Sequence, residues 1–310
     1  MSIPKIFSDS LASVAEPFQG ILLDAYGVFW GGNAVGLLPG AKESMEALVS
    51  NDKIVGILSN STQLAAKEVS KWRSHGLEQT RHFHFCLTSG EITRAIFLDA
   101  SFPFPTPRRQ FWVFSGGHPR FASHEALIQG SVYRETADID AADFIYLGIP
   151  HLNGEDQVDP ERFRRQLEAI MAKQLPMVCS NPDRFAHEGN PPRAVVRQGS
   201  LAHMYEEMGG KVLYFGKPHE KAYSIAMQYF QLYNVNGRRQ VLMVGDTPET
   251  DIRGARRFGL QSALVMKAGI MADRIEREGL ERAIQAISLD DTPDYFIDSL
   301  NLTPFRIPLW

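Results

Sequence analysis

Cysteine is scarce in this chain, whose 310 residues include only Cys86 and Cys179. Two cysteines are too few for a disulfide scaffold or for a zinc site built from four thiolates. We therefore expect two reduced, buried thiols, as is usual for a protein of the cytoplasm.

Long apolar runs are also absent. No stretch approaches the roughly 18 continuous apolar residues of a membrane-spanning helix. Near the N-terminus, Asp9 and Glu16 interrupt the region in which the apolar core of a signal peptide would lie. The sequence therefore predicts a cytoplasmic protein with no membrane partner.

The chain also lacks an excess of basic residues. Lysine and arginine number 32, aspartate and glutamate number 36, and the formal net charge is −4. A protein that binds nucleic acid through bulk electrostatics is usually basic, so we expect no nucleic-acid partner. The hydrophobic share of 44% is typical of a globular protein rather than a disordered chain. The length favours two domains.

Short apolar runs alternate with amphipathic stretches in the first third of the chain. Buried strands are predicted at 20–23 and 53–58, and helices from Pro39-Gly40 onward and over 63–75. The polar residues 59–62 suit the N-cap of the second helix. This alternation predicts a parallel sheet with right-handed crossover connections.

The same pattern continues, with a less regular middle part that we interpret as an inserted α/β domain. Further strands are predicted at 111–114, 132–134, 144–148, 176–179, 212–215, 241–244, 261–265 and 295–297. Further helices are predicted at 89–99, 160–173, 220–231, 249–258 and 271–287.

Histidines and paired glycines indicate no further site. His82 and His84 alternate with phenylalanines, which predicts a strand with one polar face rather than a metal site. Gly31-Gly32 and Gly116-Gly117 match neither a P-loop nor a dinucleotide-binding fingerprint, so we expect turns there.

Four polar clusters follow predicted strands. They are Asp24-Ala25-Tyr26-Gly27, Ser59-Asn60-Ser61, Gly216-Lys217-Pro218, and Gly245-Asp246 with Asp251. Ligands of open α/β sheets bind at the carboxyl ends of the strands. A carboxylate can act as a nucleophile, a hydroxyl and an ammonium can neutralise phosphoryl oxygens, and several carboxylates can hold Mg²⁺. The clusters therefore indicate phosphoryl transfer.

These clusters also give the chain a family resemblance. It resembles the haloacid dehalogenase superfamily, and in particular its NagD-like branch (subfamily IIA), whose four motifs occur in the same order. The motif residues are Asp24, Ser59, Lys217, and Asp246 with Asp251. The resemblance covers nearly the whole chain. It implies a doubly wound parallel-sheet core of the Rossmann-like α/β class with an inserted α/β cap domain.

The resemblance implies a hydrolase that acts on a small phosphorylated metabolite. Asp24 would attack phosphorus and form an aspartyl-phosphate. Ser59 and the backbone amide of Asn60 would hold phosphoryl oxygens, and Lys217 would neutralise the phosphate and Asp24.

Mg²⁺ is the cofactor that the resemblance implies. Asp246 would bind it directly, together with Asp24 and the backbone carbonyl of Tyr26. Asp251 would hold the metal or its waters. The resemblance further implies that the cap could present a homodimer surface, as it does in some relatives.

Spacing places the predicted cap. The interval from Asp24 to Ser59 has room for one crossover helix, whereas the interval from Ser59 to Lys217 is far longer than a crossover needs. We therefore predict a catalytic core of residues 1–86 plus 211–310 and a cap of residues 87–210.

Tyr26 departs from the family pattern, which has a second Asp at this position. In the family's phosphatases that Asp protonates the leaving oxygen and later activates water, and such general acid–base help is worth about 10²–10⁴ in rate. A phenol, with a reference pKa of about 10, can donate a proton but is a poor base near neutral pH. We therefore expect slow turnover of alkyl phosphates and accumulation of the phosphorylated enzyme.

Two alternatives stay open. The first is a catalytically impaired protein that binds phosphate or a metabolite. The second is a 2-haloacid dehalogenase, because Asp24-Ala25-Tyr26-Gly27 looks like the first motif of those enzymes. Three features oppose it: the short interval after the first motif, the lack of any arginine between Asp24 and Arg73, and the acidic pair Asp246 and Asp251.

Overall fold

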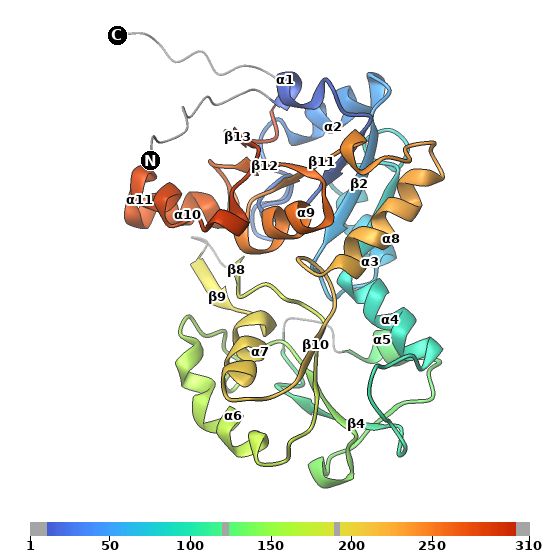
Figure 1. Cartoon of the computed structure of the whole chain (residues 1–310), viewed down its shortest axis with the longest axis vertical. Helices are drawn as coiled ribbons and strands as arrows, with labels where there is room; N and C mark the ends of the chain where they lie inside the picture. The colour runs from blue at the N-terminus through green and yellow to red at the C-terminus, as the bar shows by residue number, and fades with distance from the viewer. Residues whose placement is uncertain (1–10, 120–123, 189–192, 302–310) are drawn as a thin grey trace. The chain divides into compact units, whose positions relative to one another are not determined.

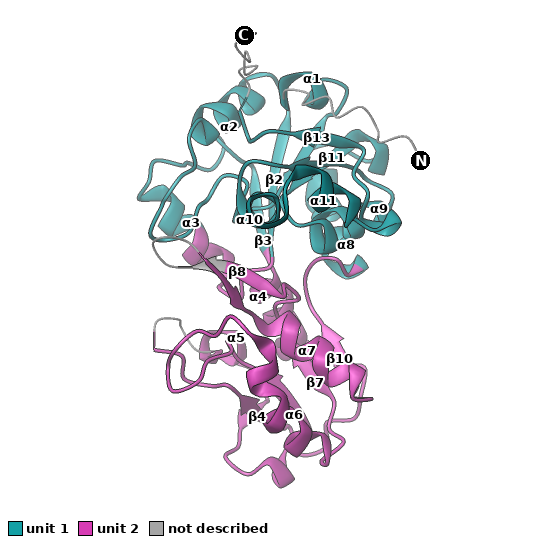
Figure 2. Cartoon of the chain, turned by 90° about the vertical axis from the view of Figure 1, so that its left-hand side faces the viewer, with its two compact units in different colours: residues 1–59, 69–87, 220–310 teal, residues 60–68, 88–219 magenta. Residues whose placement is uncertain are grey.

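The computed structural model describes residues 11–119, 124–188 and 193–301. The chain divides into two compact units (Figure 2). Unit 1 comprises residues 1–59, 69–87 and 220–310, and unit 2 comprises residues 60–68 and 88–219. The core and cap boundaries given above, at 86/87 and 210/211, stay a prediction.

A six-stranded sheet in the order β13-β12-β11-β1-β2-β3 forms the centre of unit 1 (Figure 1). The neighbouring strands β1 (Gly20–Leu23) and β11 (Val241–Gly245) run parallel, with Leu23 opposite Val244. Every residue of these two strands is buried, as in parallel sheets that carry helices on both faces. The other strands are β2 (Ile54–Ser59), β3 (Phe85–Thr88), β12 (Gln261–Val265) and β13 (Tyr295–Ile297).

Aromatic side chains pack in the core of unit 1. Phe29 and Trp72 meet edge to face with ring centroids 5.1 Å apart, and Trp30 is fully buried beside them in the same cluster. The helices of this unit are α1 (Leu11–Ala15), α2 (Ala41–Ser50), α8 (Glu220–Gln231), α9 (Arg253–Phe258), α10 (Gly269–Glu278) and α11 (Leu280–Gln285). The helix α3 (Ala65–Arg73) crosses from unit 2 into unit 1.

Unit 2 has its own parallel sheet, in the order β10-β7-β6-β4-β5. Its strands are β4 (Gln110–Phe114), β5 (Arg134–Glu135), β6 (Phe144–Leu147), β7 (Met177–Cys179) and β10 (Val212–Tyr214). The strands β8 (Phe185–Glu188) and β9 (Arg193–Val196) pair antiparallel in a separate two-stranded sheet. The helices are α4 (Ser89–Asp99), α5 (Glu125–Ile128), α6 (Arg164–Met171) and α7 (Gln198–Glu207).

The predicted α/β fold class is confirmed, and several element ends differ from prediction. The stretch 249–258 begins as a π-helical turn, Pro248–Ile252, before α9. The stretch 271–287 is two helices because Gly279, at φ +83°, separates α10 from α11. The stretch 160–173 opens with a 3-10 turn, Pro160–Phe163.

Two local predictions are wrong. The strand expected through His82 and His84 begins only at Phe85, because His82 accepts the backbone N–H of Glu78 within a turn, at 2.9 Å. The helix expected from residue 63 begins at Ala65, and its first N–H donates to the Glu91 carboxylate at 3.0 Å rather than to the polar residues 59–62.

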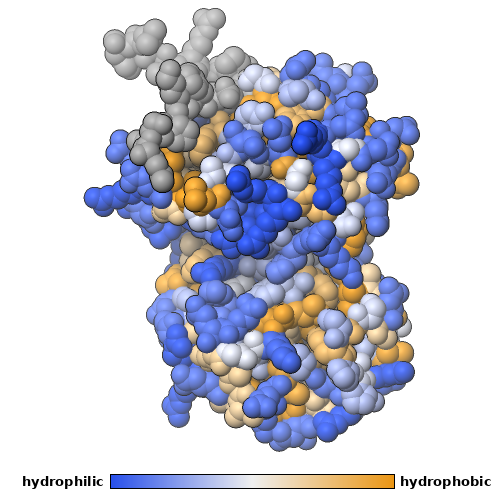
Figure 3. Space-filling model, viewed as in Figure 1, coloured by the Kyte–Doolittle hydropathy of each residue, from blue (hydrophilic) through white to orange (hydrophobic). Residues whose placement is uncertain are grey.

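Both cysteines are free thiols among the described residues, Cys179 buried and Cys86 half-buried. Burial raises the pKa of the Cys179 thiol, which keeps it protonated and unreactive. None of the described helices is long and apolar enough to cross a bilayer. The face drawn in Figure 3 is largely hydrophilic, with apolar residues in small groups between polar ones.

Candidate active site

Three carboxylates meet at one edge of the sheet of unit 1. Asp24 follows β1 and Asp246 follows β11, and the register of these parallel neighbours brings the two ends together. One carboxylate oxygen each from Asp24, Asp246 and Asp251 lies within 4.8 Å of the others. This is the edge at which ligands bind in open α/β sheets.

Backbone amides hold the three carboxylates in place. Asp251 Oδ2 accepts the N–H groups of Asp246 and Thr247, at 3.1 and 3.0 Å, and so shapes the loop after β11. Asp246 Oδ2 accepts the N–H of Ile270 at 2.7 Å. Asp24 Oδ1 accepts the N–H of Ala25 at 2.7 Å. The carboxylates are therefore oriented before any ligand binds.

The chemistry of this donor set fits a hard divalent cation. Two ionised carboxylates whose oxygens lie within 4.8 Å of one another repel by about 3 kcal/mol or more at the effective dielectric of a partly buried site. Asp246 and Asp251 are 3% and 0% exposed, so water screens them little. A bound Mg²⁺, which prefers oxygen ligands, would remove this repulsion.

Two glycines frame Asp246 because side chains at their positions would collide with it. A Cβ on Gly27 would lie 2.2 Å from Asp246 Oδ2, and a Cβ on Gly269 would lie 1.8 Å from the same atom. Both glycines also have positive φ, +78° and +64°, which disfavours L side chains. The backbone can approach the Asp246 carboxylate closely only without side chains at these two positions.

We expect Gly269→Ala to lower phosphate-ester turnover at least about tenfold, because the new methyl group displaces Asp246. The matched control is Gly279→Ala. Gly279 has a similar φ of +83° but nothing within 4 Å of an added Cβ. Steady-state kinetics on both variants, with thermal unfolding measured in parallel, checks this. Equal losses in the two variants would show that backbone strain, and not Asp246, is responsible.

Ser59 ends β2, the other neighbour of β1, and is 2% exposed. It therefore belongs to the same sheet edge as Asp24. The next residue, Asn60, lies in unit 2 together with Lys217. The structure thus places Asp24, Tyr26, Ser59, Asp246 and Asp251 in unit 1.

Lys217 and Asn60 are tightly connected within unit 2. The Asn60 side chain accepts the Lys217 N–H at 2.7 Å and donates to the Lys217 carbonyl at 3.0 Å. It also donates to Asp183 Oδ1 at 2.8 Å. Lys217 is 1% exposed, unlike an ordinary surface lysine. Sequence reasoning used only the backbone amide of Asn60 and did not find Asp183, a contact across 123 positions.

Tyr26 is held by a lysine that the sequence did not single out. The Lys71 ammonium, on α3, donates to the Tyr26 hydroxyl at 2.8 Å. It also lies 5.1, 5.3 and 5.9 Å from the ring centroids of Tyr26, Trp30 and Trp72. Cation–π attraction and the hydrogen bond together fix the phenol. In this hydrogen bond the phenol oxygen is the acceptor, and the phenol O–H is the donor group of the side chain.

Comparisons with known proteins give one family model and several proteins that are similar over most of the chain. A family model described as HAD-hydrolase-like matches residues 214–302. Chronophin of Bos taurus is 25% identical over 311 residues, covering 94% of each chain. A haloacid dehalogenase-like hydrolase from Brucella suis 1330 has a TM-score of 0.75 at 22% identity, covering 94% of this chain and 99% of that one.

The family model thus matches the C-terminal part of the chain, and the fold of nearly the whole chain is similar to that of a haloacid dehalogenase-like hydrolase. The 4-nitrophenylphosphatase of Thermotoga maritima also has a similar structure, with a TM-score of 0.62 at 22% identity, covering 93% of this chain and 96% of that one. The family prediction made from the four motifs is thereby confirmed. As in that prediction, the superfamily's motif residues stand at the ends of parallel strands β1, β2 and β11.

Proposed function

We propose that this superfamily member is a Mg²⁺-dependent phosphohydrolase that acts on a small phosphorylated metabolite through an aspartyl-phosphate on Asp24. The cluster of Asp24, Asp246 and Asp251 is the observation that carries the proposal. Two solved structures of similar fold support it, since one is named a 4-nitrophenylphosphatase and the other a haloacid dehalogenase-like hydrolase.

In the first step of the proposed reaction, an Asp24 carboxylate oxygen attacks phosphorus, and the bond to the leaving oxygen breaks. Ser59 and the Asn60 backbone amide hold phosphoryl oxygens, and Lys217 offsets their negative charge. Asp24, Asp246 and the backbone carbonyl of Tyr26 would hold Mg²⁺, with Asp251 fixing the Asp246 loop. When bound, Mg²⁺ neutralises charge on the transferring phosphoryl group.

In the second step, water attacks the aspartyl-phosphate, inorganic phosphate leaves, and Asp24 is regenerated. Tyr26 stands where the superfamily's phosphatases have the acid–base Asp. Its O–H can protonate a leaving alkoxide, but a neutral phenol draws a proton from water poorly. We therefore infer that the second step limits turnover.

The test is release of p-nitrophenol from p-nitrophenyl phosphate. Chelation by EDTA is expected to lower the rate at least about 100-fold, with recovery on adding Mg²⁺. Asp246→Asn is expected to lose a similar factor at fixed Mg²⁺. Asp290→Asn, an exposed carboxylate of the same unit, serves as the matched control. A rate that EDTA leaves unchanged would exclude the metal-dependent proposal.

Lys71 is proposed as a positioning residue for Tyr26. We expect Lys71→Met to lower kcat/KM for alkyl phosphates about two- to tenfold and to leave kcat, which the second step limits, nearly unchanged, because the Tyr26 hydroxyl loses its hydrogen bond. Lys71→Arg, which keeps the cation, should recover part of the loss. Lys67→Met on the exposed side of the same helix is the control. Equal kcat/KM for alkyl phosphates in Lys71→Met and wild type would contradict the role.

A further inference from the structure

A single π-helical turn, Pro248–Ile252, lies between β11 and α9 in unit 1. At its end the N–H of Arg253 donates to the carbonyls of Pro248 and Thr250. A π-helical turn is rare and frequently occurs at functional sites. This turn carries Asp251, one of the three clustered carboxylates, so a group that holds the turn also holds Asp251.

A buried phenol from α8 holds this turn. The Tyr223 hydroxyl donates to the carbonyl oxygen of Asp251 at 3.0 Å and to that of Thr250 at 3.2 Å. Tyr223 and Asp251 are both 0% exposed, and a hydrogen bond in such surroundings is electrostatically stronger than one in water. The contact joins residues 28 positions apart, so it is a tertiary contact and not part of the turn itself.

The packing around Tyr223 fixes its ring. A Cβ on Gly254 would lie 2.4 Å from the Tyr223 oxygen, so a glycine at the start of α9 lets the phenol reach the backbone of the turn. Tyr223 also stacks on Phe258 of α9, with ring centroids 5.8 Å apart and 27° between the ring planes. The hydroxyl is therefore held against the turn.

Asp251 passes this constraint on to Asp246. Asp251 Oδ2 accepts the backbone N–H groups of Asp246 and Thr247. The two segments pack closely, since a Cβ on Gly245 would lie 2.2 Å from Asp251 Cγ. The Thr247 hydroxyl in turn donates to Asp246 Oδ1 at 3.0 Å. A shift of the Asp251 backbone would therefore move both the peptide that carries Asp246 and a group that orients its carboxylate.

We propose that Tyr223 is a positioning residue for Mg²⁺ binding. Its hydroxyl holds Asp251, and through Asp251 it holds Asp246, so that the carboxylates are in place before the ion binds. Groups that are already ordered bind a ligand more tightly, because less freedom is lost on binding. The inference rests on the proposed function, since it requires that the carboxylate cluster binds the metal.

Tyr223→Phe removes only this hydroxyl. Removing a group that hydrogen-bonds to a metal ligand typically weakens metal binding about 10–100-fold. Tyr223 acts one contact further from the ion, so we expect a smaller rise in the Kd for Mg²⁺, about three- to tenfold. Isothermal titration calorimetry of the full chain with magnesium chloride measures this Kd without any turnover.

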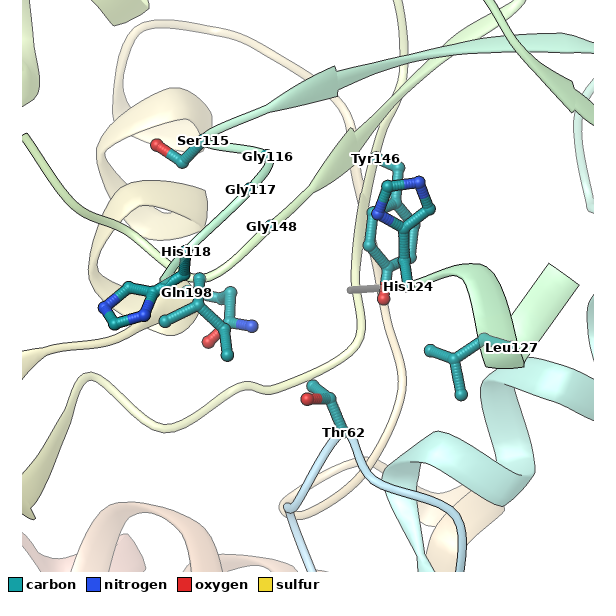
Figure 4. A pocket seen from close by; sticks show the side chains of 11 residues that line it. Thr62, Ser115, Gly116, Gly117, His118, His124, Leu127, Tyr146, Gly148 and Gln198 are labelled. Carbon is teal, nitrogen blue, oxygen red and sulfur yellow. The ribbon is translucent and has the colours of Figure 1, made fainter. Parts of the chain in front are cut away.

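Two buried tyrosines of unit 2 provide matched controls. The Tyr205 hydroxyl donates to the carbonyl of Leu175 at 2.8 Å, which is the same kind of hydrogen bond as that of Tyr223. Tyr146 lines a small pocket (Figure 4), and its oxygen lies 2.8 Å from Ser180 Oγ. Tyr205→Phe and Tyr146→Phe should lower the unfolding temperature about as much as Tyr223→Phe does, but leave the Kd for Mg²⁺ within about twofold of wild type.

The Mg²⁺ dependence of p-nitrophenyl phosphate hydrolysis gives a second readout. In Tyr223→Phe we expect the Mg²⁺ concentration for half-maximal rate to rise about three- to tenfold, and the rate at saturating Mg²⁺ to stay within about twofold of wild type. A residue that only stabilises the fold would not shift this concentration.

An equal Kd for Mg²⁺ in Tyr223→Phe and wild type, or an equal rise of Kd in Tyr205→Phe, would overturn the inference and leave Tyr223 an ordinary core residue. Failure of the proposed function gives a different result. If the wild type binds Mg²⁺ but hydrolyses no ester, a raised Kd in Tyr223→Phe alone supports the inference while the proposed function fails. A wild type that binds no Mg²⁺ would overturn both.

Discussion

Asp24→Asn is expected to reduce p-nitrophenyl phosphate hydrolysis at least about 10³-fold, to the level of the buffer. An amide is a poor nucleophile toward phosphorus, and the change also removes one of three carboxylates from the proposed metal site. The fold should survive, because an amide oxygen can still accept the Ala25 N–H now bound by Asp24 Oδ1.

The measurement is p-nitrophenol release by wild type and Asp24→Asn at equal concentration, with urea unfolding to show equal stability. Asp290→Asn again controls for loss of a carboxylate. Turnover by Asp24→Asn within tenfold of wild type would mean that the nucleophile lies elsewhere, and halide release from 2-haloacids would then be the next assay.

Tyr26→Asp is expected to raise turnover of alkyl phosphates about 100-fold or more, because it restores a group that can act as both acid and base. For p-nitrophenyl phosphate the gain should come mainly from the second step, since its leaving group needs little protonation. Tyr26 is half-buried and packs against the core, so the change should also cost about 2–4 kcal/mol of stability.

Tyr26→Phe is the matched control, because it removes only the hydroxyl that accepts from Lys71. It should slow alkyl phosphates more than aryl phosphates. Steady-state kinetics on both substrate classes, below the unfolding temperature of each variant, reports the result. Equal or lower turnover of both classes by Tyr26→Asp would contradict the claim that the missing Asp limits the reaction.

The meeting of Asp24 and Asp246 could be predicted from sequence because it depends on a short-range rule. Each follows a buried apolar strand, and parallel neighbouring strands end at one sheet edge. Gly27 belongs to the same sequence motif as Asp24, and Gly245 belongs to the same motif as Asp246. The sequence did not predict that the backbone of Gly269, at the start of α10, approaches the Asp246 carboxylate closely.

The residues that sequence reasoning missed act through contacts between distant parts of the chain. Lys71 reaches Tyr26 across 45 positions, and Asp183 reaches Asn60 across 123. Lys71 has no local pattern that separates it from a surface charge. The Gly116-Gly117 pair was expected to be a turn, and only the return of β6 beside β4 shows that its loop lines a pocket.

The predicted start of α3 was wrong because a tertiary contact, and not a local cap, pairs with its first backbone N–H. The polar residues 59–62 have the composition of an N-cap, yet α3 begins at Ala65, whose N–H is paired with Glu91 from α4. Ser61 Oγ is used instead in a turn with the N–H of Gln63, at 3.2 Å. Side chains that suit a cap also suit loops that approach a ligand, so composition alone did not distinguish the two.

The central claim is that Asp24 forms an aspartyl-phosphate and that Tyr26 does not assist its hydrolysis. The most direct test treats the protein briefly with p-nitrophenyl phosphate and Mg²⁺, quenches the reaction in acid and measures the mass of the intact protein. We predict a species heavier by one phosphoryl group in wild type, much less of it in Tyr26→Asp, and none in Asp24→Asn. Release of p-nitrophenol by the wild-type protein without any phosphorylated species would contradict the account. Equal phosphorylation of the wild-type protein and Asp24→Asn would also contradict it.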